Sequence, residues 1–141
     1  MKYKPKKPPA RLMLDAADER AKDNGCLFDP VRAQHVLDFF SGHLRLYEGE
    51  FAGQPFELMK WQQLLLERLF GWVRWSDDWN RYVRRFNRCS LWVPKKNGKS
   101  PLAAGVGLYL LISDGEAGQK IFSAAKDGKQ AGIMHAHAKH M

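Results

Sequence analysis

The sequence predicts an α/β fold, in which a helical N-terminal segment precedes an incomplete parallel sheet with flanking helices. Three observations lead to this prediction. Apolar residues recur at helical spacing before residue 75, a short apolar run at 89–93 has the character of a buried strand, and a loop, a helix and a second apolar run at 121–125 follow. The order strand, loop, helix, strand, helix is typical of the beginning of a parallel sheet.

The N-terminal part is expected to be helical, apart from its first residues. Residues 1–10 contain three prolines and four lysines and are expected to be a disordered arm, which a short helix at 11–22 follows, so that 1–27 forms one region. Asp29-Pro30 begins a second helix, because Asp caps a helix and Pro suits its first turn. A loop at 47–56 separates this helix from the next.

The helix expected at 58–73 has one apolar face. Five large apolar side chains recur there at three- and four-residue spacing: Trp61, Leu64, Leu65, Leu69 and Trp72. The pattern predicts that Trp61 lies in the core and that Gln62 lies beside this face. Residues 28–80 are therefore interpreted as the helical segment and 81–141 as the start of the sheet domain.

The composition excludes several classes of protein. The 141 residues are 45% hydrophobic, and no apolar run approaches the roughly 20 residues of a membrane helix. No apolar secretory segment follows the basic N-terminus, so we expect a cytoplasmic protein without membrane contact. Two cysteines, Cys26 and Cys89, are too few for a disulfide scaffold, so both are expected to be reduced, with Cys89 in the core.

The positive charge is concentrated in two places. The net charge is +8; residues 1–11 carry five basic and no acidic residues, and residues 74–99 carry eight basic and two acidic residues. Such patches suit polyphosphate ligands, either a nucleotide or a nucleic acid. A solvated basic surface is the simpler alternative.

The segment from Val93 to Ser100, with the sequence VPKKNGKS, matches most of a phosphate-binding loop. The usual pattern is Gly, four residues, then Gly-Lys-Ser/Thr, and here Val93 stands in place of the first Gly. An apolar strand before the loop and an apolar helix after it would direct backbone N–H groups at one anion site. Gly98 would allow close approach, Lys99 would neutralise phosphates, and the Ser100 hydroxyl would hold Mg²⁺. The ATP-binding loop is completed by Pro94, Lys95, Lys96 and Asn97.

In the order and spacing of its motifs the chain resembles the large terminase subunit of tailed bacteriophages or prophages. The motifs are Pro55-Phe56-Glu57-Leu58, Trp61-Gln62, Leu69-Phe70-Gly71-Trp72, Arg84-Arg85-Phe86, the phosphate loop, Asp114-Gly115-Glu116, Ala124-Ala125 and Gln130-Ala131. The resemblance implies a phosphate-loop ATPase that uses ATP and Mg²⁺ to translocate double-stranded DNA into procapsids. It also implies that the full-length protein cuts concatemeric DNA. The implied partners are like subunits in a ring, a small terminase subunit and a portal protein.

The resemblance also implies roles for individual residues. In the family, the first Gly of the loop is commonly absent, which agrees with Val93. Trp61 and Gln62 fall on the family's adenine-recognition motif. Lys95 falls where the family usually has an arginine proposed to act as a finger in cis, and a lysine is a point charge that lacks the planar fork of a guanidinium.

Catalytic groups are missing from the 41 residues after Ser100. Neither an acid at a strand end to hold Mg²⁺ nor a Glu to orient the attacking water can be located there, and a nuclease carboxylate cluster is absent too. The chain is therefore expected to be truncated, binding nucleotide without turnover. Alternative interpretations are another phosphate-loop ATPase, such as a helicase-like protein, or a non-enzymatic basic nucleic-acid-binding protein.

Three weaker patterns remain open. Arg81, Arg84, Arg85 and Arg88 could contact DNA phosphates, contact a neighbouring subunit or form a solvated face. Three tryptophans, Trp72, Trp75 and Trp79, could stack on bases, but packing between the second helix and the sheet is the preferred interpretation. A metal site at His135, His137 and His140 is disfavoured, since residues i and i+2 do not share a helix face.

Overall fold

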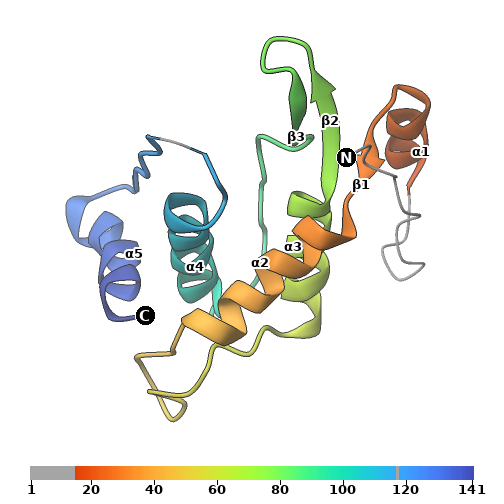
Figure 1. The fold of residues 1–141 in the computed structure, drawn as a ribbon. Coiled ribbons are helices and arrows are strands. Elements are labelled where there is room, and N and C mark those ends of the chain that lie inside the picture. Colours follow the sequence, from red (N-terminus) through yellow and green to blue (C-terminus); the bar gives the residue numbers. More distant parts are fainter. Residues whose placement is uncertain (1–14, 117) are drawn as a thin grey trace. The chain divides into compact units, whose positions relative to one another are not determined.

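The computed structural model describes residues 15–116 and 118–141, and the arm expected to be disordered at 1–10 lies outside this range. Along the described chain the elements are α1 (Ala16–Asp23), β1 (Leu27–Phe28), α2 (Pro30–His43), α3 (Lys60–Gly71), β2 (Trp72–Ser76), β3 (Arg81–Arg84), α4 (Lys99–Ile112) and α5 (Gly128–His140) (Figure 1). None of the helices in this range is long and apolar enough to cross a membrane.

The described residues form two units. Unit 1 contains the described residues up to Leu37 together with Met59–Ser90, and unit 2 contains Asp38–Leu58 and Leu91–Met141. Unit 1 therefore holds α1, α3 and all three strands, and unit 2 holds α4 and α5. The helix α2 contributes residues 30–37 to unit 1 and residues 38–43 to unit 2.

Aspartates begin the first two helices. Asp15 accepts hydrogen bonds from the backbone N–H groups of Ala17 and Asp18, each at 2.9 Å, and so caps α1. The N–H of Asp18, and then the Arg68 guanidinium, lower the pKa of the Asp15 carboxyl from its ordinary value. Asp29 accepts from the N–H of Val31 at 2.9 Å, which confirms the helix start predicted at Asp29-Pro30.

Unit 1 contains a three-stranded antiparallel sheet in the order β1-β2-β3. Phe28 of β1 pairs with Trp72 of β2, and Trp75 of β2 pairs with Tyr82 of β3. The Phe28 and Trp72 rings pack edge to face, with centroids 5.9 Å apart, and bury Ala33 of α2 beside them. Gly71 allows this packing, because a Cβ atom there would lie 2.5 Å from the Phe28 ring.

A buried carboxylate joins three elements of unit 1. Asp18 of α1 is completely buried, and its two oxygens contact Arg68 of α3 at 2.7 Å and Arg85, just after β3, at 2.6 Å. The Arg85 guanidinium also lies over the rings of Trp72 and Phe86, at 5.1 and 4.6 Å from their centroids. Arg68 also pairs with Asp15 at 2.7 Å, and Arg85 donates to the Ala17 carbonyl oxygen at 3.2 Å, so the network holds α1 against the rest of the unit.

Unit 2 is organised around Phe40, which is completely buried. Its ring packs against Phe56 at a centroid distance of 5.2 Å, and Phe39 packs against Tyr109 of α4 at 5.4 Å. The loop predicted at 47–56 is confirmed: a bridge between Arg45 and Pro55 closes its base. This arrangement holds α4, the helix that follows the candidate phosphate loop.

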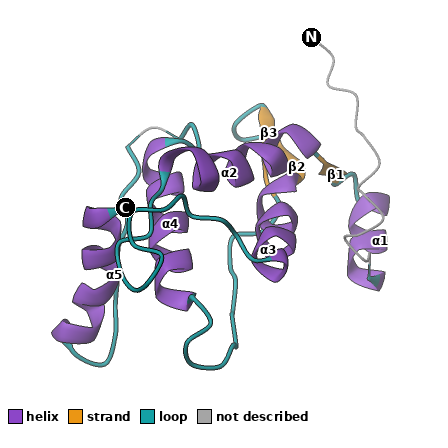
Figure 2. Cartoon of the chain, turned by 90° about the horizontal axis from the view of Figure 1, so that it is seen from below, coloured by secondary structure: helices purple, strands orange, loops and turns teal. Residues whose placement is uncertain are grey.

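The parallel strands predicted at 89–93 and 121–125 are not formed. Both segments are loop, as Figure 2 shows for the chain on either side of α4. A strand requires a neighbour to pair its N–H and C=O groups, and neither segment joins a ladder with a described residue. Trp92 and Phe122 are therefore 93% and 85% exposed, and Cys89 is exposed rather than in the core.

The prediction of the buried face of α3 was wrong, because the buried row lies one residue further along the helix. Gln62, Leu66 and Phe70 are buried, whereas Trp61 and Leu65, in the adjacent row, are only partly buried. Both rows repeat every four residues, so periodicity alone cannot choose between them. The helix also ends at Gly71 rather than near residue 73, because Trp72 begins β2.

The preferred packing role of the tryptophans holds for only one of the three. Trp72 is 1% exposed, but Trp75 and Trp79 of the β2–β3 hairpin are 46% and 69% exposed. The expectation that helices and a loop make up 28–80 is corrected too, because this segment also contains β2. Aromatic and β-branched residues on both sides of the turn at Asp77–Asn80 were the available signal for this hairpin.

Two glycines of α4 provide a matched test of the unit 2 packing. A Cβ atom at Gly105 would lie 2.5 Å from the buried Phe40 ring, whereas at Gly107 the nearest atom would be 3.5 Å away, on Ile121. We expect Gly105→Ala to lower the free energy of unfolding by about 1–3 kcal/mol through overpacking. Gly107→Ala should raise it by about 0.5–1 kcal/mol through helix propensity. Urea unfolding followed by circular dichroism measures both, and equal effects of the two substitutions would contradict the packing described.

Candidate functional site

The segment Pro94–Gly98 turns the chain directly into the N-terminus of α4. Lys96 and Gly98 both adopt positive φ angles, 65° and 66°, and Gly98 occupies the N-cap position of α4. No side chain caps this helix end, and its first turn contains no acidic residue. The first backbone N–H groups of a helix lack intrahelical acceptors and carry a partial positive charge, so this end of α4 suits an anion.

The ammonium group of Lys99 is held by the beginning of the same loop. Its Nζ donates hydrogen bonds to the carbonyl oxygens of Val93 at 2.9 Å and Pro94 at 2.7 Å. An ammonium has three donors, so these two bonds leave one for a ligand. The lysine side chain is thereby oriented before any ligand binds, which reduces the entropy lost on binding.

Asn97 completes the internal bonding of the loop. Its Nδ2 lies 3.3 Å from the carbonyl oxygens of Pro94 and of Lys95. Together with Lys99 it engages three successive carbonyl groups, which would otherwise repel a phosphate.

The other predicted loop residues differ in exposure. Pro94, Lys95 and Lys96 are exposed, whereas Asn97, Gly98, Lys99 and Ser100 are partly buried. Ser100 lies in the first turn of α4, where a hydroxyl can reach an ion at the helix end. The loop therefore combines a positive helix terminus, three lysines and a hydroxyl within seven residues.

A protein-family model matches the part of the chain that contains this loop. The family model described as "Terminase large subunit, ATPase domain" matches residues 60–141, which is more than half of the chain. The chain belongs to this terminase family. No curated protein and no solved structure matches it.

Gln62 of this terminase ATPase chain lies in unit 1, whereas the phosphate loop lies in unit 2. The Gln62 side chain is 1% exposed, and its Oε1 accepts a hydrogen bond from the Met59 N–H at 2.8 Å. Its Nε2 has no hydrogen-bond partner. An unpaired buried donor is costly, so this amide nitrogen could donate to a ligand as its hydrogen-bond partner; Trp72 Nε1 in the same unit is also buried without a partner among the described residues. Trp61, the neighbouring candidate, is partly buried.

The acidic residues after the terminase phosphate loop have structural partners. Asp127 caps α5 by accepting from the Gln130 N–H at 2.9 Å, and Asp114 accepts from Gln119 Nε2 at 3.3 Å. In the same part of the chain, His137 and His140 pack against the Tyr47 ring at centroid distances of 4.9 and 5.1 Å. Within 15–116 and 118–141, no group of three or more potential metal ligands was found.

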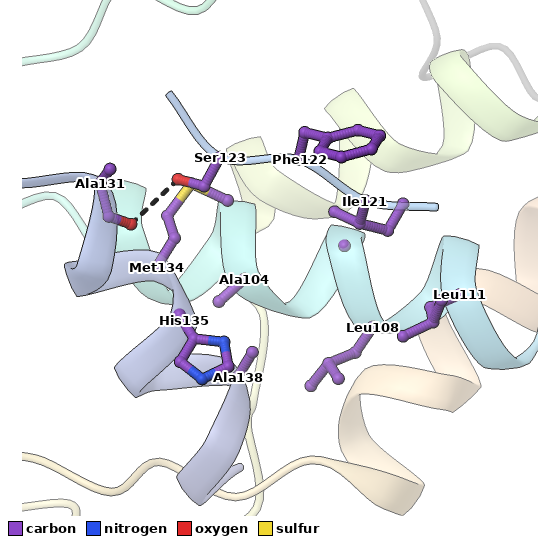
Figure 3. A pocket seen from close by; sticks show the side chains of 11 residues that line it. Ala104, Leu108, Leu111, Ile121, Phe122, Ser123, Ala131, Met134, His135 and Ala138 are labelled. Atoms are coloured by element: carbon purple, nitrogen blue, oxygen red, sulfur yellow. Dashed lines mark hydrogen bonds between the residues drawn. The ribbon is translucent and has the colours of Figure 1, made fainter. Parts of the chain in front are cut away.

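A cavity of about 390 Å³ lies in unit 2, beside the later turns of α4 (Figure 3). Its lining comes from α4, from residues 121–123 and from α5, and it includes Leu108, Phe122 and Met134. Ser123 Oγ donates to the Ala131 carbonyl oxygen at 3.0 Å and is thus already bonded within the wall. The lining contains no lysine or arginine, so the phosphate loop is the better candidate for a polyphosphate.

Sequence reasoning missed two features of this terminase chain. It did not foresee the pairing of Arg85 with buried Asp18, which makes Arg85 structural rather than a DNA or subunit contact. It also did not foresee the exposed hairpin that carries Trp75 and Trp79. No local pattern signals the ion pair, because its partners are 67 positions apart.

The backbone of the loop can be tested separately from its charge. Lys96 has a positive φ, which costs a non-glycine residue about 1–2 kcal/mol, whereas Lys95 does not. We expect Lys96→Gly to leave the protein about 1 kcal/mol more stable than Lys95→Gly, since both remove one charge but only the first relieves the backbone. Thermal and urea unfolding measure the difference, and a more stable Lys95→Gly variant would contradict the loop conformation.

Proposed function

We propose that the loop Pro94–Ser100 binds the polyphosphate of ATP together with Mg²⁺, as the nucleotide site of a DNA-packaging ATPase. The observation that carries this proposal is the Lys99 ammonium, held by the Val93 and Pro94 carbonyl groups at the open N-terminus of α4. Membership of the terminase ATPase family supports the same assignment.

Each loop residue has a role that its chemistry suits. Gly98 would allow the backbone to approach the phosphates, and Lys99 would neutralise their charge with its remaining donor. The Ser100 hydroxyl would be a ligand of Mg²⁺, which would supply further neutralisation of the phosphates. Lys96 would add to the positive field, and Lys95 would contribute a point charge rather than the forked contact of an arginine finger.

We further propose that Gln62 takes part in adenine recognition. Its support is the buried Nε2 that lacks a hydrogen-bond partner, which an acceptor on the base would satisfy. The Oε1 is already bonded to the Met59 N–H, so contact through both amide atoms would require this bond to be shared or broken. Trp61 would support the position of Gln62 on α3.

The proposed fold of the nucleotide domain is that of a phosphate-loop NTPase. Residues 89–93 and 121–125 would be strands of its parallel sheet. Support comes from their apolar sequences and from their positions immediately before the phosphate loop and after α4. The exposure of Trp92 and Phe122 is what such strands would show without their partners.

The wider function is proposed from the family. The protein would take part in ATP-driven translocation of double-stranded DNA into procapsids, in the cytoplasm of a bacterial host. Its partners would be like subunits in a ring, a small terminase subunit and a portal protein, and the activity would extend to cutting of concatemeric DNA. For the 141-residue chain itself we expect nucleotide binding with negligible turnover, because Asp114 and Asp127 are engaged in local structure.

Substitution of Lys99 tests the phosphate loop. We expect Lys99→Ala to abolish Mg²⁺-dependent binding of ATP and ADP, since it removes the ammonium that the loop orients. Calorimetric titration of the folded 141-residue chain measures this, with Lys129→Ala as a control that removes an exposed lysine of α5. Unchanged affinity in Lys99→Ala would refute the assignment, and steady hydrolysis by the parent chain would reveal a catalytic acid among its residues.

Substitution of Gln62 tests base recognition. We expect Gln62→Ala to weaken ATP binding more than binding of inorganic triphosphate, because only ATP carries the base. A competition titration with both ligands gives the ratio, and Gln63→Ala, at an exposed neighbouring position, is the matched control. Equal losses for the two ligands would mean that Gln62 only supports α3, where it caps the Met59 N–H.

A further inference from the structure

The β2–β3 hairpin of unit 1 presents aromatic side chains to solvent. Trp79 in the turn is 69% exposed and Trp75 in β2 is 46% exposed. Figure 1 shows the turn at the end of the hairpin that is farther from α3. Exposed tryptophans at one end of a hairpin are unusual for a surface whose only role is contact with water.

The Trp75 ring is held in a fixed position. Trp75 stands opposite Tyr82 in the strand register, and the two rings pack edge to face with centroids 5.2 Å apart. The indole N–H of Trp75 donates to Asp77 Oδ1 at 2.9 Å. The strand that carries Trp75 is anchored by Trp72 and Val73, both 1% exposed. Rings that are already ordered lose little entropy when a planar group packs on them.

Arginines accompany the rings. The Arg81 guanidinium lies 5.8 Å from the centre of the Trp79 ring, and both residues are exposed. Arg32 of α2 donates to the Tyr82 carbonyl oxygen at 3.2 Å, next to the Trp75–Tyr82 pair. The acids of the turn are Asp77, which is bonded to Trp75, and Asp78. An aromatic face with a cation beside it suits a ligand that alternates flat rings with negative charges.

We propose that the β2–β3 hairpin binds unpaired bases of DNA, with Trp79 stacking on a base and Arg81 contacting the adjacent phosphate. Stacking on aromatic side chains is the general means of holding single strands, because every base has an aromatic face. In an intact duplex those faces are covered by neighbouring base pairs, so unpaired stretches and overhanging ends are the favoured targets. This site would bind through aromatic stacking, whereas the nucleotide site would bind through phosphate contacts. Its use in packaging rests on the proposed function.

Binding of labelled oligonucleotides tests the proposal. Fluorescence anisotropy with the folded 141-residue chain would compare a 20-nucleotide single strand, a duplex with a single-stranded overhang, and a blunt duplex. We expect the first two to bind more tightly than the third. Trp79→Ala should weaken single-strand binding about 5- to 100-fold without changing its salt dependence. Arg81→Gln should reduce the slope of log affinity against log salt by about 0.7, the loss of one phosphate contact.

Two substitutions of other exposed residues are the controls for Trp79→Ala and Arg81→Gln. Phe51→Ala removes another exposed aromatic ring, 51% exposed in the loop of unit 2, and Arg20→Gln removes an exposed arginine of α1; both should leave binding unchanged. Trp79→Phe should restore most of the affinity, because stacking requires a ring rather than an indole. Equal affinity for the blunt duplex, or an unaltered affinity in Trp79→Ala, would overturn the proposal.

The nucleotide site is distinguished within the same experiment. The Lys99→Ala variant should lose ATP binding and keep single-strand binding. The Trp79→Ala variant should keep ATP binding and bind single strands more weakly. If Lys99→Ala weakened single-strand binding as much as Trp79→Ala, the nucleic acid would lie on the phosphate loop and the hairpin proposal would fail. If neither variant lost ATP binding, the phosphate-loop assignment would be refuted and the hairpin result would remain valid.

Discussion

The close approach of α4 to Phe40 is the contact on which the candidate site depends. Gly105 has no side chain, so the buried Phe40 ring can lie against the helix backbone, where a single added carbon would be 2.5 Å from the ring. Tyr109 packs against Phe39 one turn later. These contacts hold α4 in unit 2, and only a fixed helix can present its N-terminal N–H groups to an anion in one direction. The loop adds the Lys99 bonds to this fixed end.

Unit 1 is held together in a different way. Its N-terminal helix is attached through charge, because buried Asp18 is shared by Arg68 and Arg85. Arg85 also covers the Trp72 ring, which belongs to the core cluster that Trp72 forms with Phe28 and Ala33. Basic residues that look alike in the sequence thus have different roles: Arg85 completes a buried ion pair, whereas Arg81 is exposed and has its guanidinium 5.8 Å from the centre of the Trp79 ring.

The segments around α4 show how strongly β-structure depends on partners. Residues 89–93 and 121–125 have the composition of buried strands, yet they remain loop and expose Trp92 and Phe122. A helix satisfies its own backbone, and α4 and α5 therefore form where the sequence predicts them. A strand is paired only by another strand, so its formation is not a property of its own residues.

The sequence by itself determined the features that rest on local physics. These are the helix start at Asp29-Pro30, the turn into α4 at Gly98, and the motif order that indicated the terminase family. Tertiary structure decided the rest. Burial of Gln62 rather than Trp61 was settled by packing, since two adjacent rows of α3 repeat with the same period. The sharing of Asp18 by Arg68 and Arg85, and the exposure of Trp79 but not of Trp72, depend on contacts between residues far apart in the chain, which no local pattern encodes.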